Sequence, residues 1–344
     1  MRALVVDSFG TRPELRTVPD PACPDDGVVI EVHATGLCRS DWHGWSGHDP
    51  DIVLPHVPGH EFAGVVAETG PAVTRIQIGD RVTVPFVCAC GVCGTCRAGA
   101  HQVCEDQFQP GFTAWGSFAE LVAIPRADLN AVVLPDEIDF ATAAALGCRF
   151  ATAYRAVVAH GRVGAGDHVA VFGCGGVGLS AVMIAAARGA HVVAVDVSGA
   201  ALALAAQFGA QDVVNSADAA DRVCELTDGG AHVAIDALGG AATCRAGIES
   251  LRPRGRHVQV GLMVGQDAVA PVPMALVIAK ELEIYGSHGM AAHEYPAMLA
   301  DIASGSLQPQ RVVTGHIGLV ELVDALVTMD ERPPVGALIV DPRG

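Results

Sequence analysis

The chain has 344 residues, which is more than one ordinary hydrophobic core accommodates, so its length predicts two domains. Its formal net charge of -17 at pH 7 repels phosphate backbones and anionic lipid surfaces, which argues against nucleic-acid and membrane-surface partners. Hydrophobic residues make up 51% of the chain, but Gly, Arg or Asp interrupts each apolar run before it could span a bilayer. The start, Met1–Asp7, reaches an acid too soon for a signal peptide, so we expect a cytoplasmic protein.

The secondary-structure pattern changes near residue 150. Before it, short β-type runs such as Val28–His33 and Phe62–Ala67 are separated by loops rich in Gly and Pro. From Ala151 on, apolar strands alternate with Ala-rich helical runs, which is typical of a parallel sheet with crossover helices. After Gly289 we expect β and loop structure again, so that the C-terminal stretch rejoins the first domain. The expected strands are His168–Phe172, His191–Val195, Val233–Ala237 and Val258–Gly261, and the expected helices are Val177–Arg188, Ala200–Phe208 and Ala241–Leu251.

A glycine-rich loop follows the first of these strands. Residues 173–178 read Gly-Cys-Gly-Gly-Val-Gly, a G-x-G-x-x-G pattern placed between a strand and a helical run. Its glycines permit a tight turn and a close approach to a pyrophosphate, which then lies on the free N–H groups of the helix N-terminus. Asp196 ends the next strand, where a carboxylate accepts from ribose hydroxyls and repels a 2′-phosphate. We therefore predict NAD rather than NADP, bound by Gly173, Gly175, Gly176, Val177, Gly178 and Asp196.

Four cysteines lie close together on one short loop: Cys90, Cys93, Cys96 and Cys104. Without an export signal, such closely spaced cysteines are better metal ligands than disulfide partners. Four thiolates form the closed tetrahedral set of a structural zinc and leave no position for a substrate. Cys88 lies two residues before the first of them and is interpreted as a bystander, with a shift of ligation to Cys88 as the alternative.

A second group of potential metal ligands is dispersed along the chain. It comprises Cys38, the adjacent His60 and Glu61, and Cys148. Each residue alone is more typical of structure than of chemistry, because a free Cys is commonly buried as a small hydrophobe. Spacing alone does not connect them.

Taken together, these motifs resemble the zinc-containing medium-chain alcohol dehydrogenases of the medium-chain dehydrogenase/reductase superfamily, in order over essentially the whole chain. In that family the Cys of a G-x-C-x-[ST]-D segment, the His of a G-H-E triplet and a distant Cys bind the catalytic zinc, and Cys38, His60 and Cys148 stand at those places. The resemblance implies two zinc ions per subunit. It also implies an α/β fold in which a mostly-β GroES-like catalytic domain, residues 1–150 and 290–344, carries an inserted Rossmann NAD-binding domain, residues 151–289.

The same resemblance implies roles for residues around the metal. Glu61 stands where the family has a nearby carboxylate or transient fourth ligand, and Asp41 where a carboxylate orients the ligating imidazole. Arg39 matches a position that contacts the cofactor pyrophosphate. Ser40 and His43 match a relay that carries the alcohol proton, through a cofactor ribose hydroxyl, toward solvent.

The substrate pocket is less clearly marked. Phe86 stands where the family often places an aromatic wall, and Trp42, Trp45 and Trp115 are further candidates. This chain departs from many relatives at Ala337, where they carry an Arg that meets the pyrophosphate, so one phosphate contact is missing.

The stretch between Cys104 and Cys148 is shorter than in the dimeric animal and plant enzymes. In that respect the chain is similar to bacterial tetramers. A homotetramer is therefore expected, with a dimer as the alternative.

The expected activity is hydride transfer between a primary or secondary alcohol and NAD, giving an aldehyde or ketone, and the reverse carbonyl reduction. A polyol or amino-alcohol dehydrogenase of the same superfamily is the main alternative, although Cys148 favours alcohols because polyol enzymes often lack a Cys there. Zinc-free quinone or enoyl reductases would not need Cys38, His60 and Cys148 together. A non-catalytic NAD-binding protein is a third alternative, against which the intact set of site residues argues.

Overall fold

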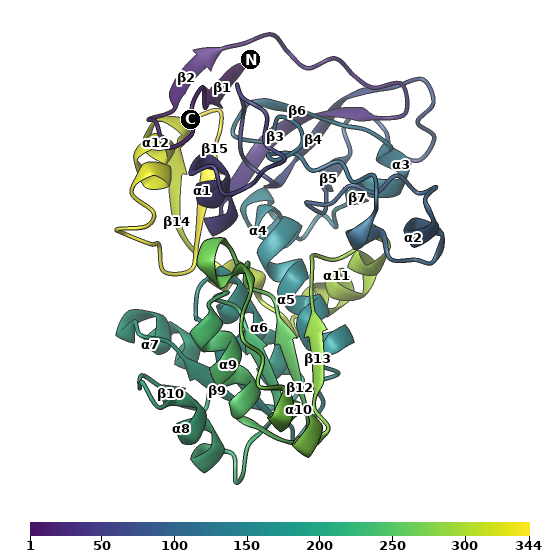
Figure 1. Ribbon diagram of the computed structural model, residues 1–344. Helices are drawn as coiled ribbons and strands as arrows, with labels where there is room; N and C mark the ends of the chain where they lie inside the picture. The colour runs from purple at the N-terminus through teal and green to yellow at the C-terminus, as the bar shows by residue number, and fades with distance from the viewer. The chain divides into compact units, whose positions relative to one another are not determined.

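A computed structural model describes residues 1–344, and the chain forms two compact units (Figure 1). Unit 1 contains Met1–Ala151, Gly289–Ser304 and Pro309–Gly344, and unit 2 contains Thr152–His288 and Gly305–Gln308. No helix in the structure is both long enough and apolar enough to cross a membrane.

Unit 1 is built on a mainly antiparallel sheet. Its seven strands follow the order β14-β15-β3-β4-β5-β7, with β6 paired to β3, and only β14 and β15 are parallel. The long strands β3 and β4 pair with each other through most of their length and are largely buried. A separate hairpin-like pair joins β1 to β2. The bounds are β1 Arg2–Val5, β2 Glu14–Thr17, β3 Val28–Leu37, β4 Glu61–Thr69, β5 Arg81–Thr83, β6 Leu121–Ile124, β7 Val132–Val133, β14 Val313–Gly318 and β15 Ala337–Asp341.

Short helices connect and flank these strands. The N-cap of α1 follows the end of β3 directly, and α4 contacts both β3 and β4. The hydrophobic core near the N-terminus combines β1 with one face of α12, where Leu319, Leu322 and Leu326 are buried. The helices of this unit are α1 Arg39–Trp45, α2 Gly94–Arg97, α3 Ala127–Asn130, α4 Phe140–Ala144, α11 Tyr295–Ala303 and α12 Leu319–Val327, and α5 Ala151–Arg155 begins at its boundary.

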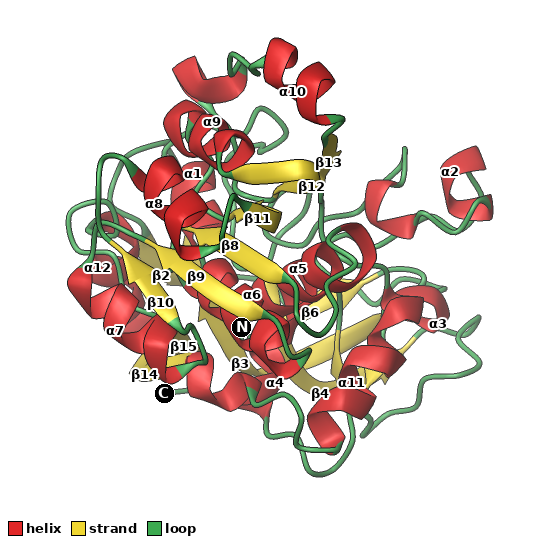
Figure 2. Ribbon diagram, turned by 90° about the horizontal axis from the view of Figure 1, so that it is seen from below, coloured by secondary structure: helices red, strands yellow, loops and turns green.

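Unit 2 contains a six-stranded parallel sheet of order β10-β9-β8-β11-β12-β13. The strands β8 and β9 are buried almost throughout because helices cover both faces, with α8 and α9 on one face and α6 on the other (Figure 2). This arrangement confirms the predicted α/β fold class with a Rossmann-type sheet. The bounds are β8 His168–Phe172, α6 Gly176–Ala187, β9 His191–Val195, α7 Gly199–Gln207, β10 Asp212–Val214, α8 Ala219–Leu226, β11 Ala231–Asp236, α9 Ala241–Glu249, β12 Leu251–Gln259, α10 Met274–Lys280 and β13 Glu283–Gly286.

Two expectations from the sequence need correction. The stretch after Gly289 is not only β and loop, because it also contains the helices α11 and α12. The strand expected at Val258–Gly261 begins seven residues earlier, at Leu251. Residues 252–255 read Arg-Pro-Arg-Gly, which indicates a turn by itself. In the structure, Leu251 and Arg256 on either side of them both pair with β11, and the four residues form an irregularity within the strand.

Candidate functional site

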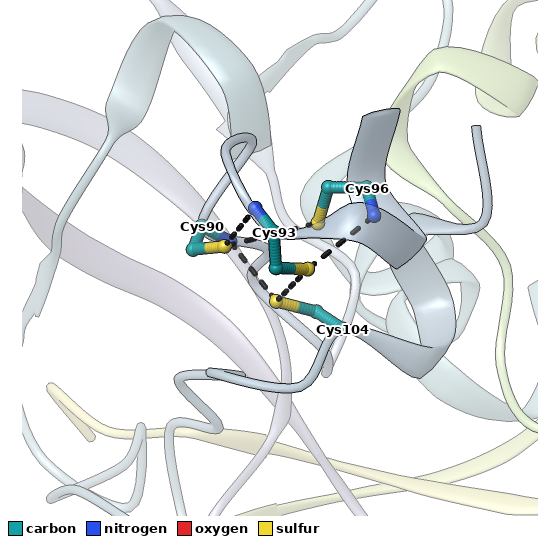
Figure 3. A group of neighbouring side chains, drawn as sticks. All are labelled: Cys90, Cys93, Cys96 and Cys104. Carbon is teal, nitrogen blue, oxygen red and sulfur yellow. Dashed lines mark hydrogen bonds between the residues drawn. The ribbon is translucent and has the colours of Figure 1, made fainter. Parts of the chain in front are cut away.

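The four cysteines of the short loop converge in unit 1. Cys93 is the N-cap of α2, and its sulfur accepts from the backbone N–H of Cys96. The Sγ atoms of Cys90 and Cys96 are 3.9 Å apart, as are those of Cys93 and Cys104 (Figure 3). All four sulfurs lie within 4.8 Å of one another, and no disulfide joins them.

This lobe fits a tetrahedral metal ion on two grounds. Zinc–sulfur bonds of about 2.3 Å place the ligand sulfurs about 3.8 Å apart in a tetrahedron, close to the separations seen here. Backbone N–H groups also point at three of the sulfurs, including those of Val92 and Cys93 toward Cys90 and that of Asp106 toward Cys104. Such donors favour thiolates, and the pKa of Cys93 is lowered to about 6 by backbone N–H groups. The donor set is that of a structural zinc.

Cys88 lies outside this group of four. Its thiol is buried and donates to the carbonyl oxygen of Pro85 at 3.6 Å. Burial raises the pKa of Cys88 to about 12, and its sulfur is not part of the group of four.

The dispersed residues also come together in unit 1. The ligand atoms of Cys38, His60, Glu61 and Cys148 all lie within 4.8 Å of one another. Cys38 follows the end of β3, the pair His60 and Glu61 stands at the start of β4, and Cys148 lies in a π-helical turn. Pairing between β3 and β4 places Gly36 opposite Glu61, which explains why residues so far apart in sequence meet. Long-range strand pairing, rather than local spacing, builds this cluster.

Asp41 fixes the orientation of His60. The Asp41 carboxylate is buried, accepts from His60 Nδ1 at 2.9 Å, and also accepts from the backbone N–H groups of Cys38 and Gly59. With the proton on Nδ1, the imidazole leaves Nε2 as a lone-pair donor. This Nε2 is buried and has no hydrogen-bond partner. An orphaned buried nitrogen among two thiols and a carboxylate fits a metal ion with Cys and His ligands.

The titratable groups of the cluster strongly shift one another's pKa values. The pKa of Cys38 is well below its ordinary value because the neighbouring Cys148 thiol, His60 and Arg149 all favour its thiolate. Burial lowers the pKa of His60, but the Asp41 carboxylate and Cys38 together outweigh burial and raise it overall. Cys38 therefore ionises readily, whereas the hydrogen bond to Cys38 and burial raise the pKa of Cys148. A bound cation would favour the thiolate of both residues.

Arg149 is a site residue that the sequence analysis missed. Its guanidinium is buried and pairs with Glu61, with Nε 2.8 Å from one carboxylate oxygen and 3.0 Å from the other. Its backbone N–H also donates to Glu61, and Nη2 donates to the carbonyl oxygen of Leu37. Arg149 thus links the three segments that carry Cys38, His60 and Cys148. The sequence does mark Arg149 in one way, because it is a charged residue within a mostly apolar run. Charged residues are rarely buried without a partner, so this position could have been recognised as a candidate for a buried ion pair.

Two further residues shape the site. Tyr295, at the start of α11, is fully buried, and its hydroxyl lies 3.3–3.4 Å from the carbonyl oxygens of Leu146 and Gly147 in the turn that carries Cys148. Phe112 packs against the His60 ring at a centroid distance of 4.9 Å. The sequence analysis missed both residues, since nothing local marks either one.

The aromatic residues expected in the substrate pocket have different surroundings. The ring of Phe86 lies 6.2 Å from that of His60, so this side chain is near the cluster. Trp42 stacks under Arg39 and touches the His43 ring by its edge. Trp45 belongs to the hydrophobic core, where its indole N–H donates to the carbonyl oxygen of Thr11. Burial of Trp45 in the core favours a structural role for it.

Trp115 lines a groove of about 390 Å³. The other residues of this groove include Met1, Pro21 and Phe108, and none of the four candidate ligands lines it. A place for Trp115 in the substrate pocket stays a prediction.

The start of α1 carries the predicted relay and phosphate residues. Ser40 and His43 lie on this helix, five residues or fewer after Cys38. Burial, Arg39 and His48 lower the pKa of His43 to about 4. Arg39 donates to Asp330 at 2.5 Å and to the carbonyl oxygen of Met329, both of which follow α12.

The glycine-rich loop in unit 2 joins β8 to α6. Helix α6 begins at Gly176, so Gly176 and Val177 form its first two residues. A Cβ at Gly178 would lie 1.8 Å from the Gly173 carbonyl oxygen, so the turn itself requires glycine there. Gly173 has φ +88°, which also favours glycine. A Cβ at Gly175 would meet nothing within 4 Å. The protein has no steric need for Gly175, and open space at this glycine suits the approach of a ligand phosphate.

Asp196 lies directly beside this loop. It follows β9, and one carboxylate oxygen accepts from the backbone N–H of Cys174 at 2.6 Å. The other oxygen accepts from the backbone N–H of Ser198 at 2.8 Å. Each carboxylate oxygen retains a second acceptor position, so Asp196 is fixed in place and can still accept from hydroxyl groups.

Comparison with known proteins agrees with both halves of this description. Residues 24–136 match the alcohol dehydrogenase GroES-like domain, and residues 176–304 match the zinc-binding dehydrogenase domain. An alcohol dehydrogenase of Geobacillus stearothermophilus is 36% identical over 292 residues, covering 83% of this chain and 84% of the relative. L-threonine 3-dehydrogenase of Sinorhizobium medicae is 32% identical and covers 96% of this chain and 95% of its own length.

A solved structure is similar to this chain over its whole length. Alcohol dehydrogenase TADH from Thermus sp. ATN1 superposes with a TM-score of 0.90 at 33% identity, over 99% of each chain. With this similarity over its whole length, the chain belongs to the zinc-containing medium-chain dehydrogenase/reductase family and is an oxidoreductase of small molecules.

Proposed function

We propose that this protein is a zinc-dependent, NAD-linked alcohol dehydrogenase that interconverts a primary or secondary alcohol and the corresponding aldehyde or ketone. The observation that carries the proposal is the buried Nε2 of His60, which has no partner and faces a cluster with the thiols of Cys38 and Cys148. Two thiolates and a neutral imidazole leave a bound zinc ion with one open position, as catalytic zinc sites require. The four-cysteine lobe would hold a second, structural zinc ion.

Zinc supplies a Lewis acid that polarises the substrate oxygen, and the dinucleotide supplies the hydride acceptor. The protein's own residues prepare the site for this chemistry. Asp41 holds His60 in the tautomer that leaves Nε2 unprotonated. Arg149 holds the Glu61 carboxylate by its guanidinium beside the other ligand atoms, where Glu61 would serve as a transient fourth ligand. Ser40 and His43 would move the proton of the alcohol toward solvent.

NAD is the proposed dinucleotide because Asp196 stands beside the glycine-rich loop with acceptor capacity to spare. A carboxylate there receives the two hydroxyls of an adenosine ribose and repels a 2′-phosphate. Val197, the next residue, is exposed and offers no positive charge to a phosphate.

A polyol or amino-alcohol dehydrogenase is the second candidate. The relative from Sinorhizobium medicae is named as acting on L-threonine, an amino alcohol, and it matches this chain over nearly its whole length. Both candidates need the same zinc, the same dinucleotide and the same proton path, and they differ only in the substrate pocket.

The deciding experiment follows nicotinamide absorbance with zinc-loaded protein, NAD or NADP, and a panel of simple alcohols, polyols, amino alcohols and their carbonyl partners. We expect turnover of simple alcohols or ketones with NAD. Preference for polyols or threonine would instead establish the second candidate. No turnover of any substrate, by protein that holds zinc and binds NAD, would contradict the catalytic function.

Metal analysis of two matched variants tests the ligand assignment. We expect two zinc ions per chain in the wild type and about one in Cys148→Ser, with turnover lost but a nearly unchanged melting temperature. Cys104→Ser also removes one thiolate, but from the other cluster, so we expect a lower melting temperature. A Cys148→Ser variant that keeps both metal ions and full activity would remove Cys148 from the ligand set.

We also propose that the protein is a homotetramer. The proposal is based on the stretch between Cys104 and Cys148, which is shorter than in the dimeric animal and plant enzymes. Size-exclusion chromatography with light scattering distinguishes a tetramer from the alternative dimer. The cytoplasmic location stays a prediction of the sequence.

A further inference from the structure

A second histidine lies against His43 at the end of α1. The Nδ1 atoms of His43 and His48 are 3.0 Å apart, and the ring centroids are 5.3 Å apart. Both rings also contact the edge of Trp42. His43 is half-buried, whereas His48 is exposed to solvent.

The backbone fixes this arrangement. At the end of α1, the N–H of His48 donates to the carbonyl oxygen of His43, and the N–H of Gly47 donates to that of Gly44. This pair of bonds is the Schellman ending of a helix, and it requires the left-handed conformation that Gly47 adopts at φ +82°. The turn therefore brings His48 back over His43 by helix geometry, independently of the side-chain contact.

Two nitrogen atoms that face each other at hydrogen-bond distance must share one proton. One ring donates through Nδ1–H, and in its neutral form its Nε2 is bare. The other ring accepts at Nδ1, and in its neutral form its Nε2 carries a proton. The pair therefore has one bare and one protonated outer nitrogen, the arrangement needed for a proton to enter at one end and leave at the other.

We infer that His48 completes the proton path, so that a proton taken up by His43 leaves the protein from His48. The proton binds His43 at Nε2, the Nδ1 proton of His43 passes to Nδ1 of His48, and His48 releases its Nε2 proton to water. Charge and protons balance, because one proton enters and one leaves. In carbonyl reduction the same steps run in reverse, and exchange of the outer nitrogens with water resets the pair between turnovers.

The electrostatics around the pair explain why a second ring is needed. Burial, Arg39 and His48 itself disfavour a charged His43 and lower its pKa to about 4, against the opposing effects of Cys38 and Asp330. Arg39 lies on the same helix, and Asp330, which follows α12, pairs with it. His43 alone would therefore hold an extra proton poorly near neutral pH, whereas transfer to His48 avoids storing charge in the half-buried ring.

This inference rests on the proposed alcohol oxidation, and His48 acts through His43 rather than on the substrate. The test compares His48→Gln with His316→Gln, which removes an exposed histidine elsewhere in unit 1. Gln at residue 48 can still hydrogen-bond to His43 but cannot pass a proton on. We expect kcat for alcohol oxidation to fall about tenfold near pH 6 with KM unchanged, since general acid–base steps contribute on this scale. The loss should shrink as the pH rises, because hydroxide then takes the proton directly, and imidazole buffer should restore much of the rate.

A second readout does not depend on turnover. In nitrogen-15 NMR spectra of zinc-loaded protein, we expect one histidine of the His43–His48 pair to carry its proton on Nδ1 at neutral pH, in addition to His60. The signal from the pair should disappear or move in His48→Gln but not in His316→Gln. A His48→Gln enzyme with the pH–rate profile of His316→Gln, or a wild type in which both rings carry their proton on Nε2, would overturn the inference and leave the proposed function standing. Absence of alcohol turnover in the wild type would instead overturn the proposed function, and the relay with it.

Discussion

Replacing Arg149 with Met should strongly destabilise the protein, because it breaks a buried ion pair beside the candidate metal cluster. The side chains of Arg149 and Glu61 are 4% and 0% exposed, so water stabilises neither charge. Met keeps the aliphatic volume of the side chain but removes the guanidinium. Glu61 then loses the side-chain donors of residue 149 and keeps only its backbone N–H. Removing one partner of a buried ion pair costs about 3–5 kcal/mol. In a unit of this size, that loss lowers the melting temperature by roughly 10 °C.

Calorimetry of zinc-loaded variants measures this loss of stability. Two further variants serve as a control and as a test of its cause. Arg12→Met is the matched control, because Arg12 pairs with Asp324 at 2.6 Å while the two side chains are 63% and 71% exposed. An exposed pair contributes less than about 1 kcal/mol, so this control should melt close to the wild type.

The double variant Arg149→Met with Glu61→Gln should be more stable than Arg149→Met alone, because no uncompensated charge then remains buried. Additive losses in the double variant, or an Arg149→Met protein that melts with the control, would refute the argument from buried charge.

Two other predictions concern the cofactor and pH. Asp196→Ala should raise the KM for NAD about 10- to 100-fold, because the charge-assisted hydrogen bonds to the ribose are lost. The variant should also show a smaller preference for NAD over NADP. If the ratio of kcat/KM with NAD to kcat/KM with NADP stays unchanged, Asp196 does not bind the ribose. Burial lowers the pKa of His257, so the unfolded chain takes up a proton below about pH 6.5 that the folded chain refuses, and stability should fall as the pH drops through this range. His257→Gln should flatten that dependence in melts between about pH 7.5 and 5, whereas equal slopes for variant and wild type would assign the dependence to other groups.

The elements that could be predicted are those whose local pattern and tertiary environment agree. The strands β8 and β9 match their expected ranges residue for residue, because both faces are buried and the apolar run is bounded by polar residues. The short edge strands β10 and β13 were missed, since only three or four residues pair and one face stays partly exposed. The start of β12 was misplaced because the strand includes the turn-like residues 252–255 only through the pairing of Leu251, which precedes them, with β11.

The same distinction holds for the candidate sites. Local spacing was enough to indicate the four-cysteine lobe and the glycine-rich loop, because each occupies one stretch of chain. Cys38, His60 and Cys148 needed the family resemblance, since strand pairing brings them together over more than 100 residues. Arg149 and Tyr295 lie beyond both kinds of inference, because their partners are 88 and about 148 residues away in sequence and neither residue belongs to a motif.

Two buried acids hold the candidate metal cluster together through their hydrogen bonds. Asp41 accepts three hydrogen bonds and is buried, and Glu61 accepts from both the side chain and the backbone of Arg149. Each acid thereby ties together segments that carry different ligands. Folded proteins rarely leave a buried polar atom without a partner, and here the unpartnered atom is His60 Nε2, the one nitrogen that a metal ion would use. A metal ion bound to His60 Nε2 would therefore satisfy an atom that the hydrogen bonds of the fold leave free, beside ligands whose positions Asp41 and Arg149 help to fix.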